Sequence, residues 1–505
     1  MNTHDLNIVL EGIILCTALT VFFVRDAKIK KLAHWSLLAS GTIFVILMLT
    51  ATSSKRVQAG PAQAVMDLSQ VEFSMRMEGA FKGLGDSNNK LMKSPDGQSD
   101  KLKVAAVKSM NKAVEKAPDS LPLQFENAIL SGELGQSFSK PVKAMQENAD
   151  KRGPQGARII ENVYQYKRIP DAELDSTIAY IKDVLKPGWF KEVAELEVYR
   201  VAGAKKLASQ AQKAYDESCQ KFLLNLIVVA LAGCGALLVG VIVVLCQLFF
   251  LPRHPSTDQE LVQVRSPVDY GALTVYGVFV GWLVLEGVIG QIMAASMQPL
   301  KNPQPVIVPL VTMTLYLLTN GPALIFVWLL ALKPNKVRFV NGVKLFFRTP
   351  NKGPFGLVLT GVLTWFACVP LVLLSQISKL FGNTEGSSNP ILSVIMNSAH
   401  HADLLTGFLF VLAVGVLPGL CEEILFRGFL YSYLRRHFGA LISMILSAAL
   451  FAGVHLDGGA FLQLFVLGFV FAFTLERQRS IVPCIIAHAL WNSSTFLIIL
   501  LLFGA

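Results

Sequence analysis

Long apolar runs alternate with short polar segments along most of the chain. We expect ten membrane helices, at residues 7–24, 34–52, 222–250, 271–295, 305–332, 355–379, 404–434, 440–456, 460–475 and 482–503. Most of these runs hold about 18 or more mainly apolar residues, enough to cross a hydrocarbon core of about 30 Å. The eighth and ninth runs are short and cross only if they are tilted or buried in the bundle. The pattern predicts an all-α, polytopic transmembrane helix bundle.

One long polar segment separates the second apolar run from the third. Residues 53–221 are rich in Lys, Glu, Ala, Ser and Gln, and the windows 101–117 and 189–218 have helical periodicity. A weak likeness to a tetratricopeptide hairpin lies around 113–135. We therefore predict three parts: two N-terminal transmembrane helices in 1–52, a soluble helical domain in 53–221 and a membrane helix bundle in 222–503.

Basic residues cluster after alternate apolar runs. They are Arg25, Lys28, Lys30 and Lys31 after the first run, Lys333, Lys336, Arg338, Lys344, Arg348 and Lys352 after the fifth, Arg435 and Arg436 after the seventh, and Arg477 and Arg479 after the ninth. Alternating spans place all four clusters on one side, which the positive-inside rule makes cytoplasmic. Residues 53–221 then form an extracytoplasmic insert domain.

The net charge of +10 raises the question of a nucleic-acid partner. Because the basic residues lie mostly in the short loops and in the insert, we interpret them as topology determinants and expect no nucleic acid. Only 16% of the residues are charged and 53% are hydrophobic, whereas soluble domains carry about 25% charge. We expect membrane lipids around the bundle and a mostly solvated insert surface, with a protein partner docked there as the alternative.

The cysteines and one histidine pair do not indicate a metal site. The seven cysteines lie mostly in apolar segments and form no CxxC pair, so we expect small buried side chains rather than ligands. The adjacent His400 and His401 point in different directions on a helix, and an interfacial polar turn is the better interpretation there.

The last apolar runs contain a set of polar residues at membrane depth. Residues 421–436 include Glu422, Glu423 and Arg427, and two later runs contain the segments FAGVH (451–455) and HALWN (488–492). Ionised groups are costly in a bilayer core, so such residues indicate a functional site by default. This set makes a reaction site the leading hypothesis.

Helical spacing relates these side chains to one another. Glu423 and Arg427 are four residues apart and can pair on one face, while Glu422 is turned about 100° away. Phe451 lies on the same face as His455, and His488 on the same face as Asn492. A rise of about 1.5 Å per residue places His455 nearer the outer side than Glu422, so helix tilt or a break at Pro418 must close that gap.

Each of these residues also has a structural interpretation. Glu423 and Arg427 could form a purely structural ion pair, with Glu422 as a spare carboxylate at the interface. A lone histidine on an apolar helix is more often a hydrogen-bonded core residue, and Asn492 could hold two helices together. Their combination favours chemistry.

The chemistry that suits this set is the activation of water. Glu422 in a low-dielectric site is a good base and could deprotonate a water together with His455. His488 and Asn492 could stabilise the oxyanion that forms at a peptide carbonyl. No serine or cysteine nucleophile pattern is present in these runs. A zinc ion held by Glu422, His455 and His488 is an alternative.

These motifs resemble those of a known family. EEILFR, FAGVH and HALWN match the patterns EExxxR, FxxxH and HxxxN of the CAAX-protease and bacteriocin-processing family of intramembrane proteases. The resemblance covers about 270–503, most specifically 418–495. It implies that Glu422 is the catalytic base, that His455 is its partner at the water, and that His488 with Asn492 forms the oxyanion site. Glu423 and Arg427 match the supporting pair, with Phe451 beside them.

The resemblance predicts an intramembrane endopeptidase of the glutamic type with a catalytic core at 404–503. We expect no required cofactor, with zinc as the alternative, and a membrane-bound protein or peptide as the substrate. We expect a multi-pass protein of a bacterial inner membrane. A non-catalytic membrane scaffold or immunity-type protein is the competing hypothesis. The first two helices and the insert are additions to the family's core of about eight helices.

Overall fold

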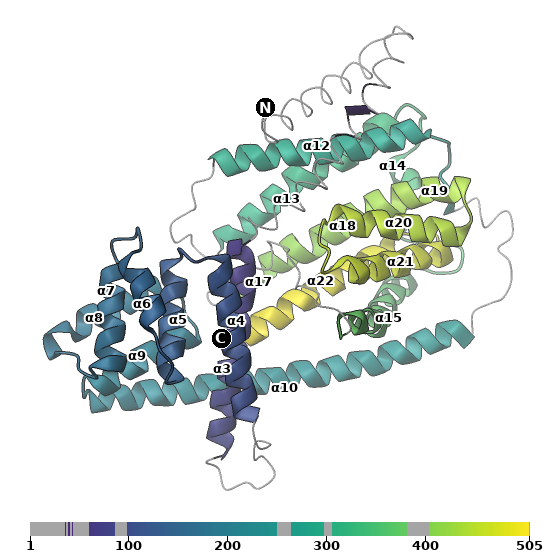
Figure 1. Ribbon diagram of the computed structural model, residues 1–505. Coiled ribbons are helices and arrows are strands. Elements are labelled where there is room, and N and C mark those ends of the chain that lie inside the picture. Colours follow the sequence, from purple (N-terminus) through teal and green to yellow (C-terminus); the bar gives the residue numbers. More distant parts are fainter. Residues whose placement is uncertain are drawn as a thin grey trace. The chain divides into compact units, whose positions relative to one another are not determined.

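The computed structural model describes residues 60–85, 98–249, 264–296, 306–380 and 403–503, together with Ser36, Ala39, Ser40 and Ile43. Every regular element of these residues is a helix (Figure 1), and an isolated bridge joins Thr349 to Lys352. The all-α prediction is confirmed. Apart from those four positions, the expected spans at 7–24 and 34–52 lie outside the described residues, as do His400 and His401.

Seven described helical segments are long and apolar enough to cross a membrane. They are Lys205–Phe249, Ala272–Gly290, Ile307–Leu332, Pro354–Ile377, Leu404–His437, Phe461–Gln478 and Val482–Phe503, and the shorter apolar helix Ala440–Val454 accompanies them. These eight segments correspond to the eight spans expected after residue 221. The protein is an integral, multi-pass membrane protein.

Contacts divide the chain into two compact units. The described residues of one unit are 60–85, 98–231 and 497–503; those of the other are 232–249, 264–296, 306–380 and 403–496, with the four isolated positions. The division falls within the long helix α10 (Lys205–Phe249).

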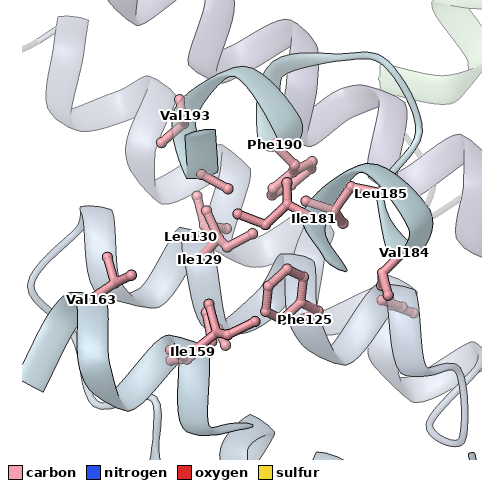
Figure 2. Close-up of a cluster of buried hydrophobic side chains, with 14 of the residues drawn as sticks. Phe125, Ile129, Leu130, Ile159, Val163, Ile181, Val184, Leu185, Phe190 and Val193 are labelled. Carbon is pink, nitrogen blue, oxygen red and sulfur yellow. The ribbon is translucent and has the colours of Figure 1, made fainter. Parts of the chain in front are cut away.

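The polar unit is built from helices of different lengths with apolar side chains that pack inward. They are α3 (Gly60–Gly85), α4 (Gln98–Lys116), α5 (Leu121–Glu133), α6 (Ser139–Gln146), α7 (Gly153–Ile160), η3 (Glu161–Gln165), α8 (Asp171–Val184), α9 (Trp189–Val201) and the first part of α10. Their apolar faces meet in one core, in which Phe125, Ile181 and Phe190 are almost completely buried (Figure 2). Burial of such side chains stabilises each by about 1.5–3 kcal/mol.

The membrane unit consists of longer, mostly apolar helices. They are α12 (Ala272–Ser296), α13 (Ile307–Phe326), η4 (Val327–Leu332), α14 (Phe339–Gly342), α15 (Pro354–Leu380), α17 (Leu404–Phe410), η5 (Val411–Val416), α18 (Leu417–Glu423), η6 (Ile424–Tyr431), α19 (Ser432–His437), α20 (Ala440–Val454), α21 (Phe461–Gln478) and α22 (Val482–Phe503). Segments η5 and η6 are π-helical and flank α18. Such widened turns are frequent at functional sites.

Two glycines allow α22 to approach the η5–α18 segment closely. A Cβ atom at Gly415 would collide with Oγ of Ser493, and one at Gly419 would lie 3.0 Å from the backbone N of Ala489. Small residues at such crossings let helix backbones come together in membranes. This close approach places Glu423 next to His488, one residue before Ala489.

Candidate active site

Glu423 lies between a cation and an imidazole. Its Oε1 is 3.0 Å from Nη1 of Arg427, and neither side chain is exposed. The same Oε1 is 2.8 Å from Nδ1 of His488. A carboxylate accepts hydrogen bonds, so the Nδ1–H of His488 donates. The predicted pairing of Glu423 with Arg427 is present, and it also orients His488.

Aromatic rings enclose the guanidinium of Arg427. Its Cζ lies 4.2 Å from the ring centre of Phe451 and 5.4 Å from that of Phe471. Stacking on aromatic faces contributes about 0.5–2 kcal/mol to holding a cation. The ring of Phe471 also stacks on His488, with centres 5.4 Å apart. The rings therefore hold both positively ionisable partners of Glu423 in place.

Glu422 faces the two histidines. Its Oε2 lies 3.8 Å from Nε2 of His455 and 3.9 Å from Nε2 of His488, and its side chain is 16% exposed. Both separations are too long for direct hydrogen bonds, but they suit a water oxygen about 2.8 Å from each group. Glu422 and His455, which were expected to hold one water between them, thus lie next to each other, and His488 lies beside them.

The backbone of α20 sets the orientation of His455. Nδ1 of His455 lies 2.7 Å from the carbonyl oxygen of Phe451, so Nδ1–H is the donor. Nε2 of the ring faces Glu422, and in the neutral form of the ring this is the nitrogen with the lone pair. The ring of Phe451 packs on the imidazole at 4.9 Å, as the spacing predicted.

Asn492 is placed differently from the other predicted residues. It follows His488 by one turn of α22 and is half-buried. It makes no hydrogen bond to another residue that the structure describes. The structure therefore brings six of the predicted residues together. They are Glu422, Glu423, Arg427, Phe451, His455 and His488. The side-chain amide of Asn492 forms no hydrogen bond with any of them.

Two further residues belong to this cluster and were missed in the sequence. The hydroxyl of Tyr316, on α13, donates to Oε1 of Glu422 at 3.2 Å. Glu286, on α12, lies close enough to interact electrostatically with both Glu422 and Tyr316. Glu286 is an acidic residue inside an expected span, and the rule that identified Glu422 could also have identified it. No pattern in the sequence distinguishes Tyr316.

The zinc alternative draws on the same three side chains, Glu422, His455 and His488. Among the residues that the structure describes, no group of three or more His, Cys, Asp or Glu side chains is placed to hold a metal ion. Zinc needs nitrogen and oxygen ligands about 2.0–2.2 Å from one point. Oε2 of Glu422 lies 3.8 Å from Nε2 of His455 and 3.9 Å from Nε2 of His488, somewhat farther than the ligand atoms of a tetrahedral zinc site lie from one another.

Comparison with known families locates the resemblance on this segment. Residues 404–494 match the family model described as Rce1-like, type II CAAX prenyl endopeptidase Rce1-like. The predicted family resemblance is confirmed. The match includes all three motifs and supports, at family level, an intramembrane endopeptidase of the CAAX-protease type. No curated protein and no solved structure matched the chain.

Proposed function

We propose that the protein hydrolyses a peptide bond at membrane depth with a water molecule activated by Glu422 and His455, as a glutamic-type endopeptidase. The observation that carries this proposal is the position of Oε2 of Glu422, which faces the Nε2 atoms of both His455 and His488 at 3.8 and 3.9 Å. The carboxylate of Glu422 and the imidazole rings of His455 and His488 surround one mostly buried point. This arrangement suits general-base catalysis.

The hydrogen-bond directions orient the water. Nε2 of His455 accepts, because its Nδ1–H is donated to the carbonyl oxygen of Phe451, and the carboxylate of Glu422 also accepts. A water between them donates one hydrogen to each group, which leaves its oxygen lone pairs directed away from both. The lone pairs attack the peptide carbonyl while Glu422 takes the proton.

His488 and Asn492 stabilise the resulting oxyanion in this mechanism. Glu423 accepts from Nδ1–H of His488 and so orients the ring. Donation to the reacting carbonyl oxygen from Nε2 requires a second proton on this ring, whose positive charge the carboxylate of Glu423 would balance. The side-chain amide of Asn492 supplies the second donor from the same helix face. When the tetrahedral intermediate breaks down, the C–N bond cleaves and the amine takes the proton from Glu422, which restores the carboxylate.

The reaction needs no metal ion in this proposal, and zinc held by Glu422, His455 and His488 is the alternative. The substrate is a membrane-bound protein or peptide, because the site lies among membrane-spanning helices. Prenylation of the substrate is not part of the proposal. The membrane proposed is a bacterial inner membrane, and the basic loops support an orientation with those loops in the cytoplasm.

The polar unit offers a surface for a protein partner. It contains a cavity of about 970 Å³, which is lined by residues that include Val104, Lys108, Trp189, Glu197 and Gln220. Charged and amide side chains beside an exposed valine suit an extended polypeptide. We assign partner docking, and not catalysis, to this unit.

Glu422→Gln tests the proposed function. The full-length variant in nanodiscs should lose about 10²–10⁴-fold in kcat on a membrane-bound peptide substrate and keep its melting temperature. Substrates trapped by this inactive variant can be identified by mass spectrometry. Unchanged turnover in the variant would overturn the role of Glu422 as the base, and a lack of turnover in the unmodified protein would favour the non-catalytic scaffold.

Glu476→Gln is the matched control, because it also removes a membrane-segment carboxylate. Glu476 pairs with Nε of Arg435 at 3.0 Å and accepts from the hydroxyl of Tyr431 at 2.7 Å. Its loss should lower the melting temperature and leave kcat near that of the unmodified protein. Opposite responses of the two variants separate catalysis from folding.

A further inference from the structure

A second pocket in the membrane unit lies between α10, α15 and α21, apart from the candidate active site. It has a volume of about 430 Å³. Ile242, Leu363 and Phe473 form part of its apolar wall, and Lys352, Thr360 and Arg477 lie among its polar residues. The mechanism proposed above uses none of these residues.

The pocket contains two cations without a counter-charge. No acidic side chain is among the described residues that line it, and neither Lys352 nor Arg477 forms an ion pair with a described residue. Nζ of Lys352 donates to Oγ1 of Thr360 at 2.6 Å. Partial burial, together with the nearby Arg477, lowers the pKa of Lys352. Two like charges in such a place are stabilised by an anion.

The apolar wall of the pocket continues into surface that faces the bilayer. Ile242 is 52% exposed and Leu363 is 36% exposed, and both lie in membrane-spanning helices. Lys352 lies two residues before the start of α15, and Arg477 lies in the last turn of α21. The cationic end of the pocket therefore lies at the membrane boundary on the side of the basic loops.

We propose that this pocket binds the phosphate headgroup of an anionic phospholipid from the leaflet on that side. Basic pockets between transmembrane helices on the cytoplasmic side are typical sites for anionic headgroups. Lys352 and Arg477 neutralise the phosphate, and the hydroxyl groups of Thr360 and Thr364 offer further hydrogen bonds. The acyl chains lie along the exposed apolar faces of α10 and α15, a feature that favours a lipid over free phosphate.

A lipid in this pocket would brace α21 against α15. The hydroxyl groups of Thr364 and Thr474, which both line the pocket, are 3.4 Å apart across these two helices. Phe471, one turn before Thr474 on α21, stacks on His488. Lipid binding at this pocket is independent of the proposed function, because none of the residues that line the pocket takes part in the proposed reaction.

Native mass spectrometry and thermal unfolding test this assignment on the full-length protein. The protein is transferred to nanodiscs or neutral detergent, and phosphatidylglycerol, phosphatidylcholine or inorganic phosphate is added. We expect phosphatidylglycerol to be retained preferentially and to raise the melting temperature. Removal of one cation should weaken its binding about fivefold, and removal of both about thirtyfold, at about 1 kcal/mol for each.

The variants are Lys352→Gln, Arg477→Gln and their combination, and Arg348→Gln is the control. Arg348 is an exposed cation of the same basic loop that does not line the pocket. Its loss should leave lipid retention unchanged. Equal retention of the two phospholipids by the unmodified protein, or an equal effect of inorganic phosphate, would overturn the proposal without any need for a variant to fold. So would a control variant that behaves like the pocket variants.

Discussion

Tyr316 and Glu422, which are 106 residues apart, share a hydrogen bond of 3.2 Å between the phenol and Oε1 of the carboxylate. The other carboxylate oxygen, Oε2, is the atom that faces both imidazoles. One hydroxyl therefore fixes the rotation of the proposed base about its terminal bond. Tyr316 is a positioning residue that acts through Glu422.

Tyr316→Phe should lower kcat about 10–100-fold and change KM little. The substitution removes one hydrogen bond to a charged group, which is worth about 1.5–3 kcal/mol, and keeps the aromatic ring. Steady-state kinetics on a membrane-bound peptide substrate measure both constants. In a Glu422→Asp background, whose shorter side chain no longer meets the phenol, the same substitution should have almost no further effect. Additive losses in the double variant would contradict this role.

Glu423→Gln should destabilise the membrane unit by about 3–5 kcal/mol, because it leaves the buried guanidinium of Arg427 without its counter-charge. The amide oxygen of Gln can still accept from His488, so the position of the imidazole is preserved. Thermal unfolding in nanodiscs measures the loss.

The double variant Glu423→Gln/Arg427→Met is the control for this prediction. It removes both charges and should be more stable than Glu423→Gln alone, since replacing a whole buried pair is often nearly neutral. A double variant that is less stable than the single variant would show that Arg427 contributes mainly through its stacking on Phe451 and Phe471.

Helical spacing predicted the contacts within single helices. Glu423 and Arg427 meet at 3.0 Å, and Phe451 packs on His455 at 4.9 Å, because residues four apart share a helix face. The rule that an ionisable residue inside a membrane span indicates a functional site identified Glu422. It applies equally to Glu286, whose place beside the site was overlooked.

Contacts between helices were harder to predict. A helical rise of about 1.5 Å per residue placed His455 nearer the outer side of the membrane than Glu422. In the structure, Nε2 of His455 lies 3.8 Å from Oε2 of Glu422. His455 directly follows the last residue of α20, and α18 is flanked by π-helical segments that change its path. The depth of a side chain in the membrane depends on how the helices cross and on close approaches such as that at Gly415. The spacing of residues along the sequence does not show these features.

A metal-free mechanism predicts that chelators leave the activity unchanged. Purified protein treated with 1,10-phenanthroline should keep its kcat and contain substoichiometric zinc by elemental analysis. The zinc alternative predicts the opposite, a loss of activity that added zinc restores. Its site would need Glu422, His455 and His488 to converge on one ion at about 2.0–2.2 Å.

The polar unit should lose stability as the pH rises. Burial raises the pKa of Glu126, on α5, from 4.5 to about 8; the nearby carboxylate of Glu72 raises it further, and Lys186 lowers it. The unfolded state therefore ionises this group at lower pH than the folded state does. The stabilisation is complete below about pH 4.5 and is lost as the pH rises through about 8, by an amount on the order of 5 kcal/mol.

Glu126→Gln should remove most of this dependence, because an amide does not titrate and has nearly the same shape. Hydrogen exchange of the α5 amides in the full-length protein measures the local stability between pH 5 and pH 8, after correction for the intrinsic exchange rate. The unmodified protein should lose protection over this range, and the variant should lose less. If the protection of the α5 amides in the unmodified protein increased with pH, Glu126 would be ionised in the folded state. Lys186 would then affect the pKa of Glu126 more than burial does.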